Sequence, residues 1–158
     1  DDRYGIMGRY LDDPEAETYP IVPMGMAIAP QALAVSQVAD GFAAAVAWVG
    51  PLDDAGVWLQ PLTENGQSRG EPIKLTERVG AASSVSIANR ADGGGIVYSI
   101  VIDGIPQVRY FRLDQSGDPV ADERVLISSP RQAQDASIAA LGTGFAVADR
   151  ELPSIERE

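Results

Sequence analysis

VWLQPLTENGQSRGEPIKLTERVGAASSVSIA, at residues 57–88, returns in altered form as VRYFRLDQSGDPVADERVLISSPRQAQDASIA at residues 108–139. The two copies align without a gap at an offset of 51 residues, which places Val57 on Val108, Leu62 on Leu113 and Gly66 on Gly117. A period of this length with no helical pattern inside it indicates a repeated sheet unit. The sequence therefore predicts an all-β fold built from copies of one antiparallel unit.

Each repeat contains four predicted strands, named a to d. Short alternating or β-rich apolar segments lie between glycines and prolines about every ten residues, which is typical of antiparallel sheets. The first repeat has strands at 32–36, 43–49, 56–62 and 71–76, and the second at 84–89, 95–102, 107–113 and 123–128. A turn signal links c to d in both copies, at 63–66 and 114–117, where glycine takes the positive φ. The matching turns support this strand assignment.

Both ends of the chain continue the pattern. Segment 5–11 aligns with 56–62 at the same offset, so residues 1–30 are expected to supply strands c and d, with d at 20–22. Strands a and b are expected at 135–139 and 144–148, within residues 135–158. Complete units span 31–83 and 84–134. The prediction is a single domain of twelve strands in the order c-d, a-b-c-d, a-b-c-d, a-b.

Three motifs carry a resemblance to a known family. They are Gly41-Phe42 with Val46-Ala47-Trp48, Gly56-Val57 with Leu62 and Gly66, and Val85-Ser86-Ile87-Ala88. Together they resemble the β-propeller repeats of secreted or cell-surface bacterial proteins of the myxobacterial type. The chain departs from the motifs in two places: Gly93-Gly94-Gly95 replaces the Gly-Phe pair, and Asp149 stands where a tryptophan is expected. The resemblance implies four-stranded propeller blades and an extracellular or cell-surface location, with the periplasm as the alternative.

The expected strands make about three blades, whereas characterised propellers close a ring with roughly four to eight. An open stack of blades exposes flat apolar faces, which favour association. We therefore expect the remaining blades to come from another polypeptide or from a second copy of this chain. The start at Asp1, without an initiator methionine, is typical of a processed chain or a fragment and favours another polypeptide.

Composition excludes several classes of function. The chain of 158 residues carries 12 basic and 23 acidic side chains, a net charge of −11, which repels nucleic acids and anionic membranes. It contains no cysteine and no histidine, so thiolate chemistry, Ser-His-Asp triads and the usual zinc sites are excluded. No apolar run is long enough to insert into a membrane. No catalytic residue can be assigned.

Five side chains are candidates for ligand binding. Trp48 and Trp58 can stack on a ligand, although packing between blades is the alternative. Arg109 lies on a predicted c strand, and Arg78 and Arg131 lie in d-to-a loops. Cationic side chains in an acidic protein can mark a site for an anion, and ion pairing with the many surface acids is the alternative.

Asp53 and Asp54 are the candidates for a metal site, with calcium as the only cofactor considered. They lie in a b-to-c loop, and calcium takes six to eight oxygen ligands. Solvated turn residues are the alternative. The acidic segments 12–15 and 114–118 lack the alternating spacing of a calcium loop with a distal glutamate. A hairpin turn accounts better for the second segment, because it aligns with 63–67.

The sequence favours a non-catalytic binding or structural module that presents loops to a protein or glycan. One alternative is an oligomeric propeller lectin, which requires aromatic residues that recur between blades. Trp58 instead aligns with Arg109 and Met7, which weakens that hypothesis. The other alternative is an enzyme whose catalytic residues lie on the missing blades.

Overall fold

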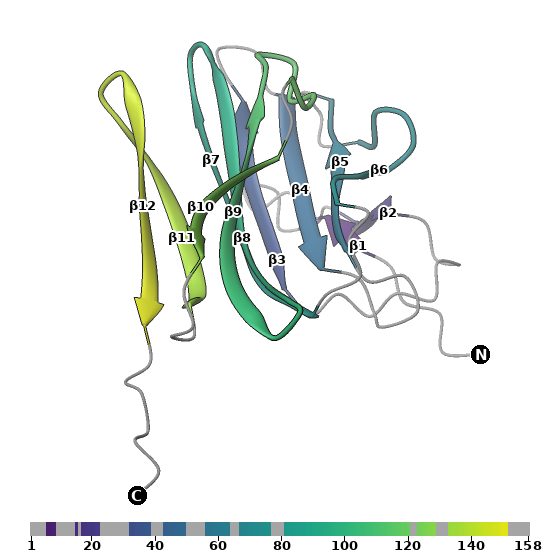
Figure 1. Ribbon diagram of the computed structural model, residues 1–158. Coiled ribbons are helices and arrows are strands. Elements are labelled where there is room, and N and C mark those ends of the chain that lie inside the picture. The colour runs from purple at the N-terminus through teal and green to yellow at the C-terminus, as the bar shows by residue number, and fades with distance from the viewer. Residues whose placement is uncertain are drawn as a thin grey trace, which may run out of the picture.

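The computed structural model describes residues 6–8, 15, 17–22, 32–38, 43–49, 56–63, 67–76, 81–120, 123–128 and 133–151. These residues form strands and turns, and no helix occurs among them (Figure 1). The strands make four antiparallel sheets. The prediction of an all-β fold is therefore confirmed. No helix in this part of the chain is long and apolar enough to cross a membrane.

Each sheet is a meander, in which every strand pairs with its neighbours in sequence. The strands are β1 (Ile6–Gly8), β2 (Tyr19–Val22), β3 (Leu33–Val38), β4 (Ala43–Val49), β5 (Val57–Pro61), β6 (Ile73–Lys74), β7 (Ala81–Arg90), β8 (Gly93–Ile102), β9 (Ile105–Leu113), β10 (Arg124–Ser128), β11 (Ala133–Leu141) and β12 (Gly144–Glu151). The sheets are β1–β2, β3–β6, β7–β10 and β11–β12. Each predicted strand overlaps one of these elements.

The turns that follow β5 and β9 are closed by equivalent backbone hydrogen bonds. The backbone N–H of Thr63 donates to the carbonyl of Gln67 at 2.8 Å, and Asp114 donates in the same way to Asp118 at 2.9 Å. Gly117 has a φ of 81°, the left-handed conformation expected of it. The predicted turn at 114–117 is therefore confirmed, whereas its counterpart glycine, Gly66, lies outside the described residues.

The sheet β7–β10 packs against a neighbouring sheet on each face. One face buries a cluster with the sheet β3–β6, made of Val57, Leu59, Ala82, Val85, Ile87, Ile96, Tyr98, Ile100, Phe111 and Leu113. The other buries a second cluster with β11–β12, made of Ala88, Val97, Val108, Ala136 and Ile138. Because side chains alternate between the faces of a strand, a strand buried on both sides is apolar almost throughout. This explains the continuous burial of residues 93–100 in β8.

The first strands of successive sheets lie next to one another. Strand β7 contacts β3 on one side and β11 on the other (Figure 1). Serine hydroxyls bridge the second contact. The N–H of Ala136 donates to Ser84 Oγ at 3.1 Å and to Ser99 Oγ at 3.2 Å, and the N–H of Ile138 donates to Ser86 Oγ at 3.3 Å. These bonds fix β11 against the face of the preceding sheet.

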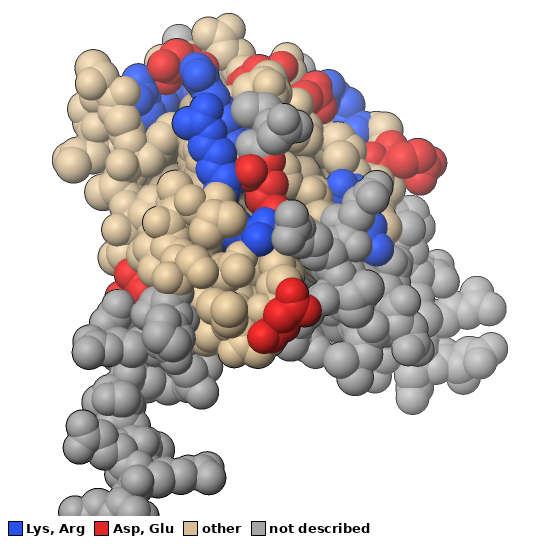
Figure 2. All heavy atoms as spheres, in the orientation of Figure 1, with Lys and Arg blue, Asp and Glu red and all other residues tan. Residues whose placement is uncertain are grey.

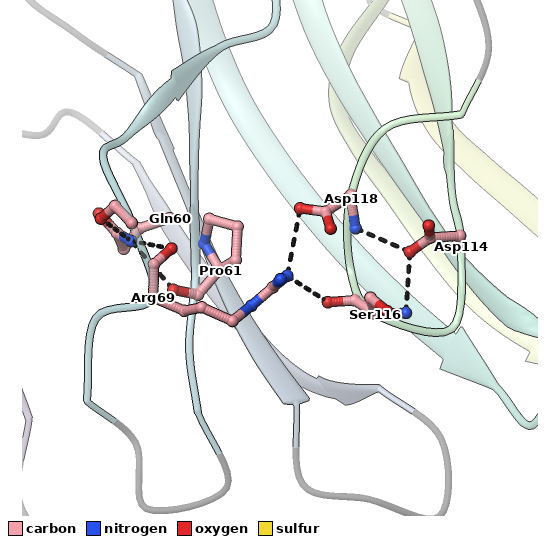
Figure 3. Close-up of polar contacts among 7 residues, drawn as sticks. Gln60, Pro61, Arg69, Asp114, Ser116 and Asp118 are labelled. Atoms are coloured by element: carbon pink, nitrogen blue, oxygen red, sulfur yellow. Dashed lines mark hydrogen bonds and ion pairs between the residues drawn. The ribbon is translucent and has the colours of Figure 1, made fainter.

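Polar contacts also join the sheets at the end where the turns after β5 and β9 lie. Arg69 Nη2 donates to the carbonyl of Ser116 at 2.7 Å and to Asp118 Oδ1 at 3.1 Å (Figure 3). Ser116 and Asp118 in turn donate their backbone N–H groups to Asp114 Oδ1 at 2.8 and 3.0 Å. Asp114 thus holds the turn in shape while Arg69 ties it to the neighbouring sheet.

Candidate functional site

A hollow of about 370 Å³ lies between the sheet β7–β10 and the hairpin β11–β12. Its lining consists of Arg90, Asp92, Gly93, Gly94, Tyr110, Arg112, Val120, Arg124, Thr143, Gly144 and Phe145. We call it the arginine pocket, after Arg90, Arg112 and Arg124. Figure 2 shows Lys and Arg side chains gathered in a band in the upper half of the view, over the region of the sheet β7–β10 beside β11–β12.

Strand geometry explains why these side chains converge. Tyr110 and Arg112 are two residues apart on β9, so they project from the same face. Arg124 lies directly opposite Tyr110 in the β9–β10 pairing and shares that face. Arg90, at the end of β7, has its guanidinium carbon 5.6 Å from the ring centroid of Phe145 on β12. With Gly93 and Gly94 of β8, the pocket is therefore built from five strands of two sheets.

A run of glycines provides the space. A Cβ at Gly95 would lie 2.6 Å from Tyr110 Cε2, closer than real side chains approach, and 3.0 Å from Ile138 Cδ1. A Cβ at Gly94 would lie 2.0 Å from Asn89 Oδ1. Gly93 has a φ of 133°, which side-chain-bearing residues rarely adopt. The departure from the repeat at residues 93–95 therefore lets Tyr110 pack directly against the backbone of β8 at Gly95.

The three arginines are held differently. Arg90 Nη2 lies 3.0 Å from the carboxylate of Asp92, and its guanidinium also lies over Phe145, so its position is fixed. Within the described part of the chain, no ion pair is formed by Arg112 or Arg124. Asp114, which lines a shallower hollow beside Arg112, already accepts two backbone N–H groups through Oδ1. Two guanidinium groups therefore remain available to an external anion.

Tyr110 contributes a protonated hydroxyl to the pocket. Burial raises the pKa of Tyr110 above its ordinary value, and the charges of Arg112, Arg124 and Arg90 oppose that rise. The ring of Tyr110 also lies 6.3 Å from the ring of Phe145, between centroids, at an interplanar angle of 51°. The pocket thus combines cationic groups with a hydrogen-bond donor and two aromatic rings.

The structure places the predicted ligand-binding residue Arg109 away from this pocket. Its side chain projects from the opposite face of β9 and is only 5% exposed. It donates to Gln107 Oε1 at 2.6 and 2.8 Å and forms an ion pair with Glu123. Its guanidinium is therefore engaged inside the protein.

The remaining predicted site residues are only partly described. Trp58 is half-buried on β5, with Lys74 Nζ 5.3 Å from its ring centroid. Trp48 pairs with Trp58 in the β4–β5 register, but its side chain lies outside the described residues. Outside them as well are Arg78, Arg131, Asp53 and Asp54. The predictions made for these residues therefore remain predictions.

Potential metal ligands do not gather in the described part of the chain. They contain no group of three or more His, Cys, Asp and Glu side chains placed to hold a metal ion. Asp92 is the one acid in the described lining of the arginine pocket, and it is paired with Arg90. The described lining of the pocket can therefore bind and orient an anion.

Comparisons with known proteins identify no relative of this chain. No protein-family model matches it, and neither a curated protein nor a solved structure does so. Its function must therefore be inferred from its own residues.

Proposed function

We propose that the chain is a non-catalytic binding and structural module, a β-propeller segment of a secreted or cell-surface protein. Another chain or a second copy of this one completes its ring. The side-by-side order of β3, β7 and β11 supports this proposal, because first strands of successive blades are neighbours around a propeller axis. The resemblance of the repeats to those of secreted bacterial proteins supports the location.

An uncovered apolar face carries the proposal. The strand pairings make Leu33 of β3 equivalent to Val85 in the next sheet. By the same pairings, Val35 is equivalent to Ile87. Val85 and Ile87 are buried in the core cluster between the sheets. Leu33 and Val35 are instead 53% and 64% exposed. Equivalent positions are thus apolar in both sheets, but only one pair is covered.

The last sheet has a matching surface. Leu141 is 68% exposed, and Ala139, Ala146 and Ala148 are exposed on β11–β12 as well. In the described residues, β12 pairs with β11 alone, which leaves one edge of its backbone open. Further blades would cover both surfaces, and adding a strand at the open edge would satisfy its backbone groups.

Native mass spectrometry of the purified chain tests the proposal. We expect a defined assembly larger than the 16.7 kDa monomer, or a complex with a second polypeptide when the chain is isolated from its source. The double variant Leu33→Glu/Val35→Glu should release the monomer because it places charges in the covered face. Val125→Glu, at an exposed apolar position on the edge strand β10, is the control and should leave the assembly intact. A folded, dispersed wild-type monomer would contradict the proposal.

A further inference from the structure

We propose that the arginine pocket binds the oxyanion group of a small acidic saccharide. The pocket lies between two sheets of this chain, so the inference does not depend on how, or whether, a ring is completed. Its size of about 370 Å³ lies within the range of about 300–1,000 Å³ that is typical of small-molecule sites.

The charge distribution supports an anionic ligand. The chain carries a net charge of −11, yet three of its 12 basic side chains line one hollow beside a single acid. Guanidinium groups present rigid pairs of N–H donors that match the geometry of a carboxylate or sulfate. Arg90 is already held by Asp92 and Phe145, so less side-chain entropy is lost when a ligand binds beside it.

The two arginines without an ion pair are the residues most directly available. Arg112 projects from β9 and Arg124 from the start of β10, on the face that Tyr110 shares. Both line the hollow and both side chains are exposed. An oxyanion between them would gain charge-assisted hydrogen bonds without breaking an ion pair of either arginine with another described residue.

The uncharged part of the lining favours a sugar over an inorganic ion. Tyr110 and Thr143 carry hydroxyl groups that can pair with sugar hydroxyls, and Phe145 offers an aromatic surface beside them. Sugar rings carry both hydroxyl groups and C–H faces, so they suit a lining that mixes hydrogen-bonding and aromatic groups. Sulfate and phosphate ions have no surface that would use the aromatic ring.

Isothermal titration calorimetry with glucuronate, glucose and inorganic sulfate tests this inference. We expect saturable binding of glucuronate that weakens as salt is raised, and at least tenfold weaker binding of glucose, which lacks the carboxylate. Sulfate should bind more weakly than glucuronate at the same ionic strength. Binding of sulfate as tight as that of glucuronate would overturn the saccharide assignment. Equal binding of glucose and glucuronate would overturn the role of the arginines.

Matched variants locate the site. Arg112→Gln and Arg124→Gln should each weaken glucuronate binding at least tenfold, because each removes a charged donor from the pocket. Arg150→Gln makes the same charge change at an exposed arginine that pairs with Asp135, outside the pocket, and should leave binding unchanged. An equal loss in all three variants would overturn the inference. Leu33→Glu/Val35→Glu should retain glucuronate binding, so failure of the ring proposal and failure of this one give different results.

Discussion

Tyr110 occupies the space that a side chain at Gly95 would need. Its Cε2 atom lies 2.6 Å from the position of a Cβ at residue 95, and its hydroxyl oxygen lies 3.2 Å from the same point. The ring therefore rests directly on the backbone of β8, where it forms one wall of the arginine pocket. A missing side chain on one strand thus makes room for a pocket-lining side chain on the next.

Gly95→Ala should destabilise the protein by about 1–3 kcal/mol, because the added methyl group overpacks the contact with Tyr110 and Ile138. Urea unfolding followed by circular dichroism measures the change. Gly144→Ala is the matched control, since the nearest atom to its Cβ is 3.9 Å away, and it should change the free energy of unfolding by less than about 0.5 kcal/mol. Equal stability of the two variants would show that Tyr110 does not depend on the glycine.

The 51-residue repeat predicts some of the strand pairings of this fold and misses others. The β-bridge between Leu62 and Ser68 recurs 51 residues later, between Leu113 and Pro119. The alignment alone therefore predicts strands c and d and the turn between them. The pairing of strands b and c does not follow. Trp58 pairs with Trp48, so an offset of 51 would pair its counterpart Arg109 with Ser99. Arg109 pairs instead with Tyr98, the preceding residue. The connection after β8 is a tight turn at Asp103 and Gly104, and its different length changes the register.

The sequence alone does not predict the arginine pocket. Arg109 and Arg112 both lie on a strand flanking Tyr110 and Phe111, and either could have faced a ligand. Alternation separates them onto opposite faces, but only the packing of β11–β12 decides which face holds the hollow. Arg90 and Arg124 come from strands far apart in sequence. The spacing of Tyr110 and Arg112 was the one local signal available.

The pH dependence of stability should reveal the burial of Tyr110. Its raised pKa means that the folded state favours the neutral phenol. The resulting stabilisation is fully present below the ordinary tyrosine pKa of about 10, and it is lost as the pH rises through the folded-state pKa. Above about pH 10, the unfolding free energy of the wild type should therefore fall relative to that of Tyr110→Phe, which has no phenol to ionise at this position.

The arginines around Tyr110 supply a second test of the same group. Arg112→Gln removes a charge that lowers the pKa of Tyr110, so that pKa should rise further in the variant. Because the chain has five tyrosines, phenolate absorbance is compared with and without Tyr110→Phe in each background. An unchanged titration in Arg112→Gln would mean that the guanidinium does not lie near the phenol.

Glu123→Ala should destabilise the protein by about 3–5 kcal/mol. The Arg109 and Glu123 side chains are 5% and 16% exposed, and removing the carboxylate leaves a buried guanidinium with reduced compensation. Asp135→Ala breaks the ion pair with Arg150, in which the two side chains are 57% and 60% exposed, and should cost less than about 1 kcal/mol. Urea unfolding measures both. A loss below about 1 kcal/mol for Glu123→Ala would favour the ligand-binding role that the sequence predicts for Arg109.

Ser84 and Ser86 should hold the hairpin β11–β12 against the rest of the fold. Their hydroxyl oxygens accept the backbone N–H groups of Ala136 and Ile138, and each bond is expected to contribute about 1 kcal/mol. Ser86→Ala removes the hydroxyl that accepts the Ile138 N–H, whereas in Ser84→Ala the hydroxyl of Ser99 still accepts the Ala136 N–H. Amide hydrogen exchange should therefore accelerate more at Ile138 in the first variant than at Ala136 in the second.

Ser137→Ala is the control for these variants, because it removes an exposed serine from β11 itself. It should leave exchange at both amides unchanged. Equal acceleration at Ala136 and Ile138 in all three variants would mean that β11 frays as a unit and that the serine bonds do not anchor it individually. If the Ile138 amide loses its protection from exchange in Ser86→Ala alone, the hydroxyl of Ser86 is the group that anchors β11 to β7.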